Sequence, residues 1–167
     1  HHASSAASDV YKRQFYNCSG LSSITIPNSV DSIENYAFQN CSSLINIIIP
    51  DSVSSIGQFA FQNCSNLSSI TLPSNVTSIG ASAFRSCTNL NSINIPGSVI
   101  SIENNLLRNC SSLTNIAISE GVSSIGSSAF QSCTALTSIT IPNSVSSIGS
   151  SVFQNCTSLS TISIPEG

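Results

Sequence analysis

A unit of 23 residues recurs along almost the whole chain, and this repetition restricts the possible folds more than any other feature. Cysteines mark the period at Cys18, Cys41, Cys64, Cys87, Cys110, Cys133 and Cys156. Leucines follow three places later, at Leu21, Leu44, Leu67, Leu90, Leu113, Leu136 and Leu159. Isoleucines come next, at Ile24, Ile47, Ile70, Ile93, Ile116, Ile139 and Ile162. A fixed period of this length predicts a solenoid, in which each repeat stacks on its neighbours.

Each unit predicts two extended segments and a short return. Residues 69–72 alternate polar and apolar side chains, which is typical of a half-buried strand. Pro73 ends that strand because proline has no N–H to donate. Residues 76–79 suit a second extended segment, and residues 83–84 begin a single helical or 3₁₀ turn that returns to the next cysteine.

Glycine follows the second extended segment in most units. We expect it to take a positive φ at this corner, where a side chain would be strained. The positions are Gly57, Gly80, Gly126 and Gly149, and Glu34 and Glu103 replace glycine in two units.

The repeat divides the chain into two parts. Residues 1–14 do not fit the unit and resemble a tag or the translation of a sequencing adaptor, so we expect a non-native or disordered leader. Residues 15–167 predict a solenoid of six to seven units. Neither end shows the atypical unit that closes most solenoids, which indicates a fragment of a longer protein.

The motif of this chain resembles the BspA-like leucine-rich repeats. The resemblance covers residues 15–167, and one copy is carried by Ile47, Ile49, Pro50, Val53, Ile56, Gly57, Ala60, Phe61 and Cys64. It implies a β-rich, right-handed solenoid with a parallel sheet on one face. It also implies a secreted or surface-attached protein that takes part in adhesion, and therefore an extracellular or cell-surface location. The family has no shared catalytic motif, so the resemblance implies no site residues.

The low charge of the chain argues against two classes of partner. Only 7% of the residues are charged, and the basic ones are Lys12, Arg13, Arg85 and Arg108. Nucleic-acid binders carry clustered Lys and Arg, so we expect no nucleic-acid partner. No run of 18 apolar residues exists in the sequence, so we expect no membrane span.

The cysteine column predicts buried, reduced thiols. Seven is an odd number, equivalent cysteines point the same way, and a free cysteine behaves as a small apolar residue. Occasional disulfides or oxidation are the alternative. A zinc site is disfavoured because ligands from successive rungs would lie in a line rather than at the corners of a tetrahedron.

The sequence also predicts a protein that is not an enzyme and has no cofactor. His1 and His2 are the only histidines, so the repeat region offers no Ser/His or Cys/His pair. Glu34 and Glu103 share a column but lie three rungs apart, about 14 Å at the spacing of strands in a sheet. Paired glycosidase carboxylates lie closer together.

Asparagine sequons are frequent, but repetition accounts for most of them. Some could carry glycans in a eukaryotic secretory route. Structural use, such as capping of the short return turn, is the interpretation we favour. The sequons begin at Asn17, Asn40, Asn63, Asn66, Asn75, Asn109 and Asn155.

Two surfaces are candidates for binding. The first is formed by outward strand positions in two ladders, in the face that solenoids use for ligands. One ladder is Ser23, Asn46, Ser69, Ser92, Asn115, Ser138 and Thr161, and the other is Thr25, Ile48, Thr71, Asn94, Ala117, Thr140 and Ser163. The second is an aromatic edge of Tyr36 and Phe59, where later units carry Ser or Asn. Solubility would equally explain the ladders, and packing against neighbouring turns would explain the aromatic pair.

These features favour a binding module that recognises a protein or a glycan, as part of an adhesin. The alternative is a structural spacer that holds another domain away from the cell. Uniform ladders favour the spacer, whereas local variation at Tyr36, Phe59, Arg85 and Arg108 favours binding.

Overall fold

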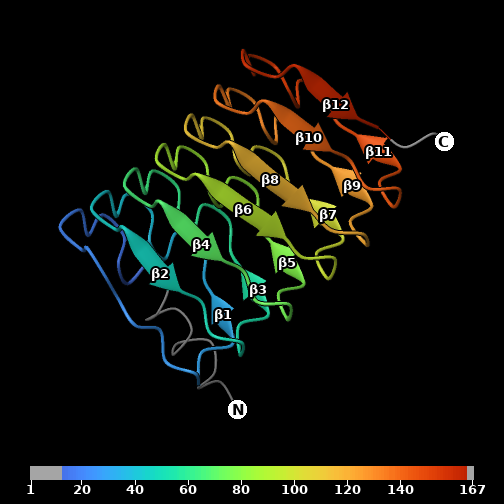
Figure 1. Ribbon diagram of the computed structural model, residues 1–167. Coiled ribbons are helices and arrows are strands. Elements are labelled where there is room, and N and C mark those ends of the chain that lie inside the picture. The colour runs from blue at the N-terminus through green and yellow to red at the C-terminus, as the bar shows by residue number, and fades with distance from the viewer. Residues whose placement is uncertain (1–12, 165–167) are drawn as a thin grey trace.

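The alternation of polar and apolar residues produces the first strand of each rung, in which a central isoleucine points inward. The computed structural model describes residues 13–164. The first strands of successive rungs are β2 (Asn46–Ile48), β4 (Ser69–Thr71), β6 (Ser92–Ile95), β8 (Asn115–Ile118), β10 (Ser138–Thr140) and β12 (Thr161–Ser163). They lie parallel and form bonded sheets in the orders β2-β4-β6-β8 and β10-β12. The rungs follow one another along a single axis (Figure 1). The predicted parallel β-solenoid is confirmed.

Each second extended segment also pairs with its neighbours. These two-residue strands are β1 (Ser32–Ile33), β3 (Ser55–Ile56), β5 (Ser78–Ile79), β7 (Ser101–Ile102), β9 (Ser124–Ile125) and β11 (Ser147–Ile148). They form two parallel sheets, β1-β3-β5 and β7-β9-β11, so the chain has a second β face beside the first.

The apolar columns fill the space between these faces. Six of the cysteines, from Cys41 onward, are buried in the core, as predicted. Phenylalanine rings stack between rungs, with centroids 5.3 Å apart for Phe38 and Phe61 and 5.4 Å for Phe61 and Phe84. Leu106 and Leu107 replace Ala and Phe in the fifth rung and are fully buried there. Stacking is therefore continuous, and it supplies apolar burial that one rung alone would lack.

The return segment is not the predicted helical or 3₁₀ turn, and residues 13–164 contain no helix. Two kinds of backbone hydrogen bond alternate along the return segment instead, one within the turn and one between rungs. Gln39 N–H bonds to Tyr36 O at 3.1 Å within the turn, whereas Phe38 N–H bonds to Ala60 O of the next rung at 2.8 Å. Tyr36 and Asn40 have left-handed φ values of 64°. These two residues interrupt any right-handed run, and the inter-rung bonds take the donors that a helix would use.

The corner glycines were predicted to have positive φ, and that prediction is wrong. Among the described glycines only Gly121 does, at 110°. Close approach between rungs explains the glycines instead. A Cβ at Gly57 would lie 2.4 Å from Asn35 N, and one at Gly126 would lie 2.7 Å from Asn104 N.

Glu103 marks a break in the second sheet. Gly80 N–H bonds to Ile56 O at 2.8 Å, and Gly126 N–H bonds to Ile102 O at 2.7 Å. Within residues 13–164 the equivalent bond from Glu103 is missing, and β5 does not pair with β7. The break in the second sheet thus coincides with the replacement of the corner glycine by glutamate, whereas the return turns of the same two rungs remain bonded, as from Ser82 N–H to Asn104 O at 3.0 Å.

Candidate binding surfaces

The structure brings the predicted ladders into register on the outer side of the first sheet. Asn46 lies opposite Ser69, and Ile48 lies opposite Thr71. The same register pairs Asn94 with Ala117 and, at the other end, Thr140 with Ser163. Thr25 joins the series through a parallel bridge to Ile48. All of these side chains are exposed, and we call this surface the ladder face.

The polar groups of the ladder face are almost all unpaired. Within residues 13–164 Asn94 is the only ladder residue whose side chain has a hydrogen-bond partner, because its Oδ1 accepts a bond from Ser119 at 3.5 Å. Elsewhere on the surface, hydroxyls bond to the preceding rung. Ser54 Oγ donates to Asp31 O and Thr77 Oγ1 donates to Ser54 O, both at 3.2 Å. The ladder hydroxyls and amides therefore remain available to a ligand.

An exposed aliphatic pair lies beside the ladders. Ile48 is 81% exposed within the ladder face, and Ile45, directly before the same strand, is 51% exposed. Sequence reasoning included Ile48 but missed Ile45. The signal was present, because the other units carry Ser, Asn or Thr at the position of Ile45.

The aromatic pair stacks on another edge, which is formed by the return turns. The rings of Tyr36 and Phe59 lie 5.1 Å apart and are inclined by 9°. Both residues are half-buried, and both have left-handed φ, 64° and 57°. Arg13 lies against the outer side of Tyr36, with its guanidinium carbon 4.7 Å from the ring centroid. Bulky residues rarely adopt this backbone conformation, which the equivalent Ser82 and Asn105 share and for which asparagine is better suited.

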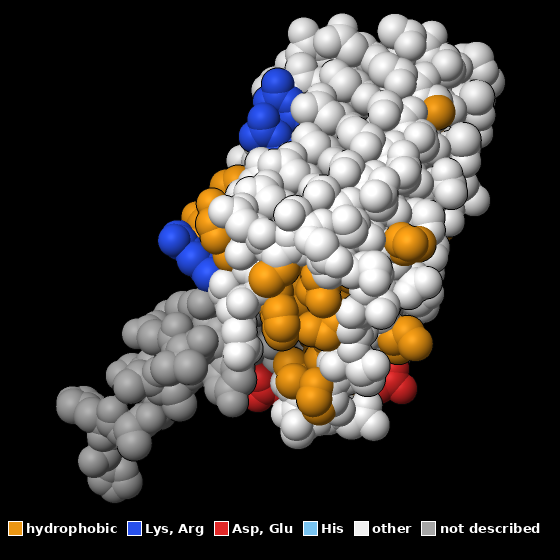
Figure 2. Space-filling model, turned by 90° about the vertical axis from the view of Figure 1, so that its left-hand side faces the viewer, with side chains coloured by type: hydrophobic (Ala, Val, Ile, Leu, Met, Phe, Trp, Pro, Cys, Tyr) orange, Lys and Arg blue, Asp and Glu red, His pale blue; other side chains and the backbone are white. Residues whose placement is uncertain are grey.

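Arg85 and Arg108 continue this edge in the column of Gln39 and Gln62. That column lies three residues beyond the aromatic one in each turn. The arginines occupy adjacent rungs and are half-buried. Arg108 Nη1 donates to Asn105 Oδ1 at 3.4 Å, while its buried Nε has no partner among residues 13–164. Figure 2 shows basic side chains on one edge of the molecule with hydrophobic side chains between them.

The cysteine thiols are free and serve the core. Each buried thiol donates to a backbone carbonyl of the preceding rung, as from Cys64 Sγ to Phe38 O and from Cys110 Sγ to Phe84 O, both at 3.1 Å. Burial raises the pKa of Cys64 and that of Cys110 from 9.0 to about 12. A thiol with so high a pKa is a poor nucleophile at neutral pH.

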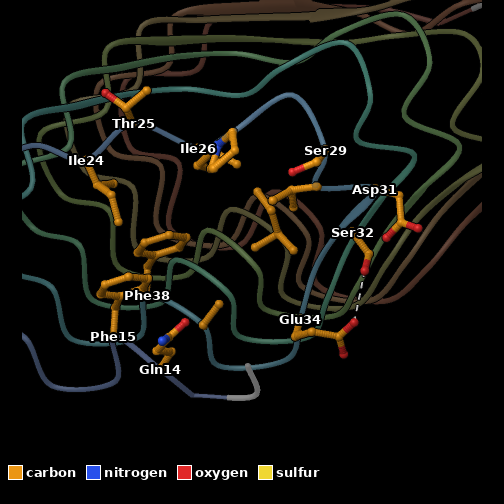
Figure 3. A pocket seen from close by; sticks show the side chains of 14 residues that line it. Gln14, Phe15, Ile24, Thr25, Ile26, Ser29, Asp31, Ser32, Glu34 and Phe38 are labelled. Carbon is orange, nitrogen blue, oxygen red and sulfur yellow. Dashed lines mark hydrogen bonds between the residues drawn. The ribbon is translucent and has the colours of Figure 1, made fainter. Parts of the chain in front are cut away.

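A hollow lies where the described part of the core begins. Its volume is about 600 Å³, and Phe15, Ile24, Ile26 and Phe38 extend into it (Figure 3). Glu34 lies at its rim and accepts a hydrogen bond from Ser32 Oγ at 3.0 Å. The lining repeats the columns that fill the interior, so the hollow is the face of the first described rung of the core.

The described residues contain no group of three or more His, Cys, Asp or Glu side chains that could hold a metal ion. Nor does any helix in residues 13–164 have the length and apolar character to cross a membrane. The predictions for His1 and His2, and for most of the leader, fall outside the described residues.

Most sequon asparagines have a structural role. Asn17, Asn40 and Asn63 have φ values of 60–64°. They form an amide ladder, in which Asn63 Nδ2 donates to Asn40 Oδ1 at 2.8 Å and Asn40 Nδ2 donates to Asn17 Oδ1 at 2.6 Å. Asparagine tolerates left-handed backbone, so these residues shape the turn instead of capping a helix.

Several solved structures are similar to this chain in both sequence and fold. A leucine-rich cell-surface protein of Faecalibacterium prausnitzii is 38% identical, with a TM-score of 0.76 over 84% of this chain and 38% of its own. A leucine-rich repeat protein of Bacteroides ovatus is 32% identical, with a TM-score of 0.69 over 93% of this chain and 46% of its own. A leucine-rich repeat protein of T. pallidum is 27% identical, with a TM-score of 0.67 over 75% of this chain and 69% of its own.

The chain therefore spans less than half the length of the first and second of these relatives. No curated protein sequence matches it. The sequence profile of the BspA type leucine rich repeat region, in six copies, matches residues 8–134 and 78–167. With the repeat, the stacked parallel strands and the solved relatives in agreement, this chain belongs to the BspA-type leucine-rich repeat family.

Proposed function

We propose that this chain is a non-enzymatic binding module of a secreted or cell-surface adhesin, and that a protein or glycan binds to its ladder face. The residues we assign to this face are Thr25, Asn46, Ile48, Thr71, Asn94, Asn115, Thr140, Thr161 and Ser163. Leucine-rich repeats are generally protein-interaction modules, and the Faecalibacterium relative is a cell-surface protein.

The observation that carries this proposal is the contrast between two groups of hydroxyls. Ser54, Thr77 and Ser146 donate to backbone carbonyls of the preceding rung. Within the described residues Thr71 and Thr140 have no such bond, although they are exposed in a regular array. Free donors and acceptors at a constant spacing suit an extended polar ligand such as a peptide backbone or a glycan chain.

The affinity of one rung is expected to be low. Each hydrogen bond contributes about 0.5–1.5 kcal/mol net. Ile45 and Ile48 add an apolar contact at one place only. Useful binding then depends on many rungs, or many copies, acting together. Since the ladder face carries no charged residue, raised salt should weaken this binding only slightly.

The alternative function is a spacer that holds another domain away from the cell. The uniformity of the ladders supports it, because Ser, Thr and Asn recur there from rung to rung. A spacer needs no ligand, so it predicts that no immobilised protein or glycan is retained.

An array of matrix proteins and glycans, probed with a multivalent form of the chain, separates the two functions. A variant with Thr71→Lys, Asn94→Lys and Thr140→Lys should lose about tenfold or more in affinity for any ligand found. The matched control places the same charges at exposed positions directly before the second strands, with Ser54→Lys, Thr77→Lys and Ser146→Lys. Equal binding by both variants would place the ligand elsewhere, and no retained ligand would favour the spacer.

A further inference from the structure

The return-turn edge carries a second contact surface of different chemistry from the ladder face. We propose that Tyr36, Phe59, Arg85 and Arg108 form a docking site for an acidic, extended segment of a protein partner. This inference rests on the proposed binding function, but it concerns a separate edge of the molecule. We call these four residues the aromatic–arginine edge.

The two aromatic residues are difficult to explain by folding alone. Their left-handed φ values, 64° and 57°, cost roughly 1–2 kcal/mol for a residue with a side chain. The same position in later rungs is filled by Ser82, Asn105 and other small polar residues. Ser82 and Asn105 have φ values of 59° and 58°, so the left-handed backbone is common to the whole column and the fold accepts a small polar side chain there. The fold therefore does not require the half-exposed aromatic surface of Tyr36 and Phe59, and exposed aromatic residues of this kind are enriched in interfaces.

The two arginines lack the partners that arginine usually finds. They lie in adjacent rungs, about 4.8 Å apart at the spacing of strands in a sheet. Within residues 13–164 neither forms an ion pair, and the one bond of Arg108 is to an amide oxygen at 3.4 Å. Other rungs carry glutamine here, at Gln39, Gln62, Gln131 and Gln154, so the fold does not require a positive charge.

The distribution of charge selects an acidic partner. No Asp or Glu occurs in the two columns of this edge, while the described carboxylates lie on the second leg and at its corners, at Asp31, Glu34, Asp51, Glu103 and Glu120. Two neighbouring guanidinium groups suit bidentate contacts with carboxylates. Tyr and Arg together also have the composition of an interface hot spot.

The length of the edge sets the size of the segment. Tyr36 and Arg108 are three rungs apart, which is about 14 Å at the usual strand spacing. An extended chain covers this distance with about four to five residues. The partner segment would therefore place an apolar side chain against Phe59 and carboxylates against Arg85 and Arg108.

The probe for this proposal is a fluorescent synthetic peptide in which glutamates follow one aromatic residue. We expect saturable binding at low ionic strength that weakens as salt is added. A matched peptide with glutamine in place of glutamate should bind about tenfold more weakly or not at all. The variant with Arg85→Gln and Arg108→Gln should lose about three- to tenfold in affinity. It introduces only residues that other rungs use, so it should fold.

A second variant, with Tyr36→Asn and Phe59→Ser, tests the aromatic half in the same way. The lysine variant of the ladder face is the control and should bind the acidic peptide at least as well as the unchanged chain. If the peptide does not bind at low ionic strength, or binds the arginine variant equally well, the proposal is wrong. Binding of a sulfated oligosaccharide without binding of the peptide would overturn it in favour of an anionic glycan. None of these results depends on whether the ladder face has a ligand.

Discussion

At the scale of single residues, the thiol column shows why cysteine recurs in this fold. The carbonyl of Phe61 accepts the N–H of Cys64 in its own turn and the thiol of Cys87 in the next rung, both at 3.2 Å. Alanine would fill part of the same space, but it could not donate to this second lone pair. The cysteine therefore links two rungs while remaining an apolar core residue.

The thiols predict that the protein loses stability at alkaline pH. In the unfolded chain they release protons near their ordinary pKa of 9.0, whereas Cys64 and Cys110 in the folded protein have pKa values of about 12. Above pH 9 the unfolded state then binds fewer protons, so the free energy of unfolding falls as pH rises towards 12. Denaturant titrations under reducing conditions would measure this slope.

A Cys110→Ala variant is the control for this prediction, because one titrating thiol is removed. Its stability at neutral pH should be lower, but its decline above pH 9 should be shallower. A free energy of unfolding that stays constant from neutral pH to about pH 11 would contradict the assignment of the thiols to the folded core.

At the scale of elements, the spacing between second strands is set by the glycine column. Gly126 N–H bonds to Ile102 O at 2.7 Å, and its missing side chain leaves room for Asn104. Asn104 Oδ1 in turn accepts a bond from Ser127 N at 2.7 Å. Where Glu103 stands in this column, the pairing to the preceding rung is lost.

This arrangement predicts that alanine lowers stability at one position of the column and leaves it almost unchanged at another. Gly126→Ala forces a Cβ to within 2.7 Å of Asn104 N, and it should lower stability by roughly 1–3 kcal/mol. Glu103→Ala should change stability by less than about 0.5 kcal/mol, since a Cβ is already accommodated there. Thermal unfolding of both variants would test this. Equal melting temperatures would show that the glycines do not determine the rung spacing.

The first turn gives a further prediction about residues 1–14. Phe15 stacks on Phe38, with centroids 5.3 Å apart, and its N–H bonds to Ala37 O at 3.2 Å. Deleting residues 1–14 removes the contact of Arg13 with Tyr36, which is worth about 0.5–1 kcal/mol at an exposed site. The melting temperature should therefore change little. Deletion through residue 21 also removes Phe15 and Cys18 and should lower it clearly. If the shorter deletion caused an equal loss, the leader would be a structural cap.

At the scale of the whole molecule, the period predicted the stack, the inward columns and the ladder face. These depend on which residues recur, and recurrence is visible in the sequence. The return turn was not predicted, because its inter-rung bonds and left-handed residues depend on the distance between rungs. The departures from the repeat at Tyr36 and Glu103 were visible in the sequence. Their consequences, the stacked aromatic pair and the missing pairing of β5 with β7, depend on contacts between rungs and could not be predicted from the repeating unit. The corner glycines were attributed to backbone conformation, whereas the cause is close approach between neighbouring rungs.

The central claim is that the ladder face binds the ligand, and amide chemical-shift mapping tests it most directly. An isotopically labelled chain would be titrated with the ligand that the array identifies. We predict saturable shifts concentrated in β2, β4, β6 and β10, near Ile48, Thr71 and Asn94, with little change in β3, β5 and β9. Shifts concentrated in those second strands, or spread evenly over the chain, would contradict the claim.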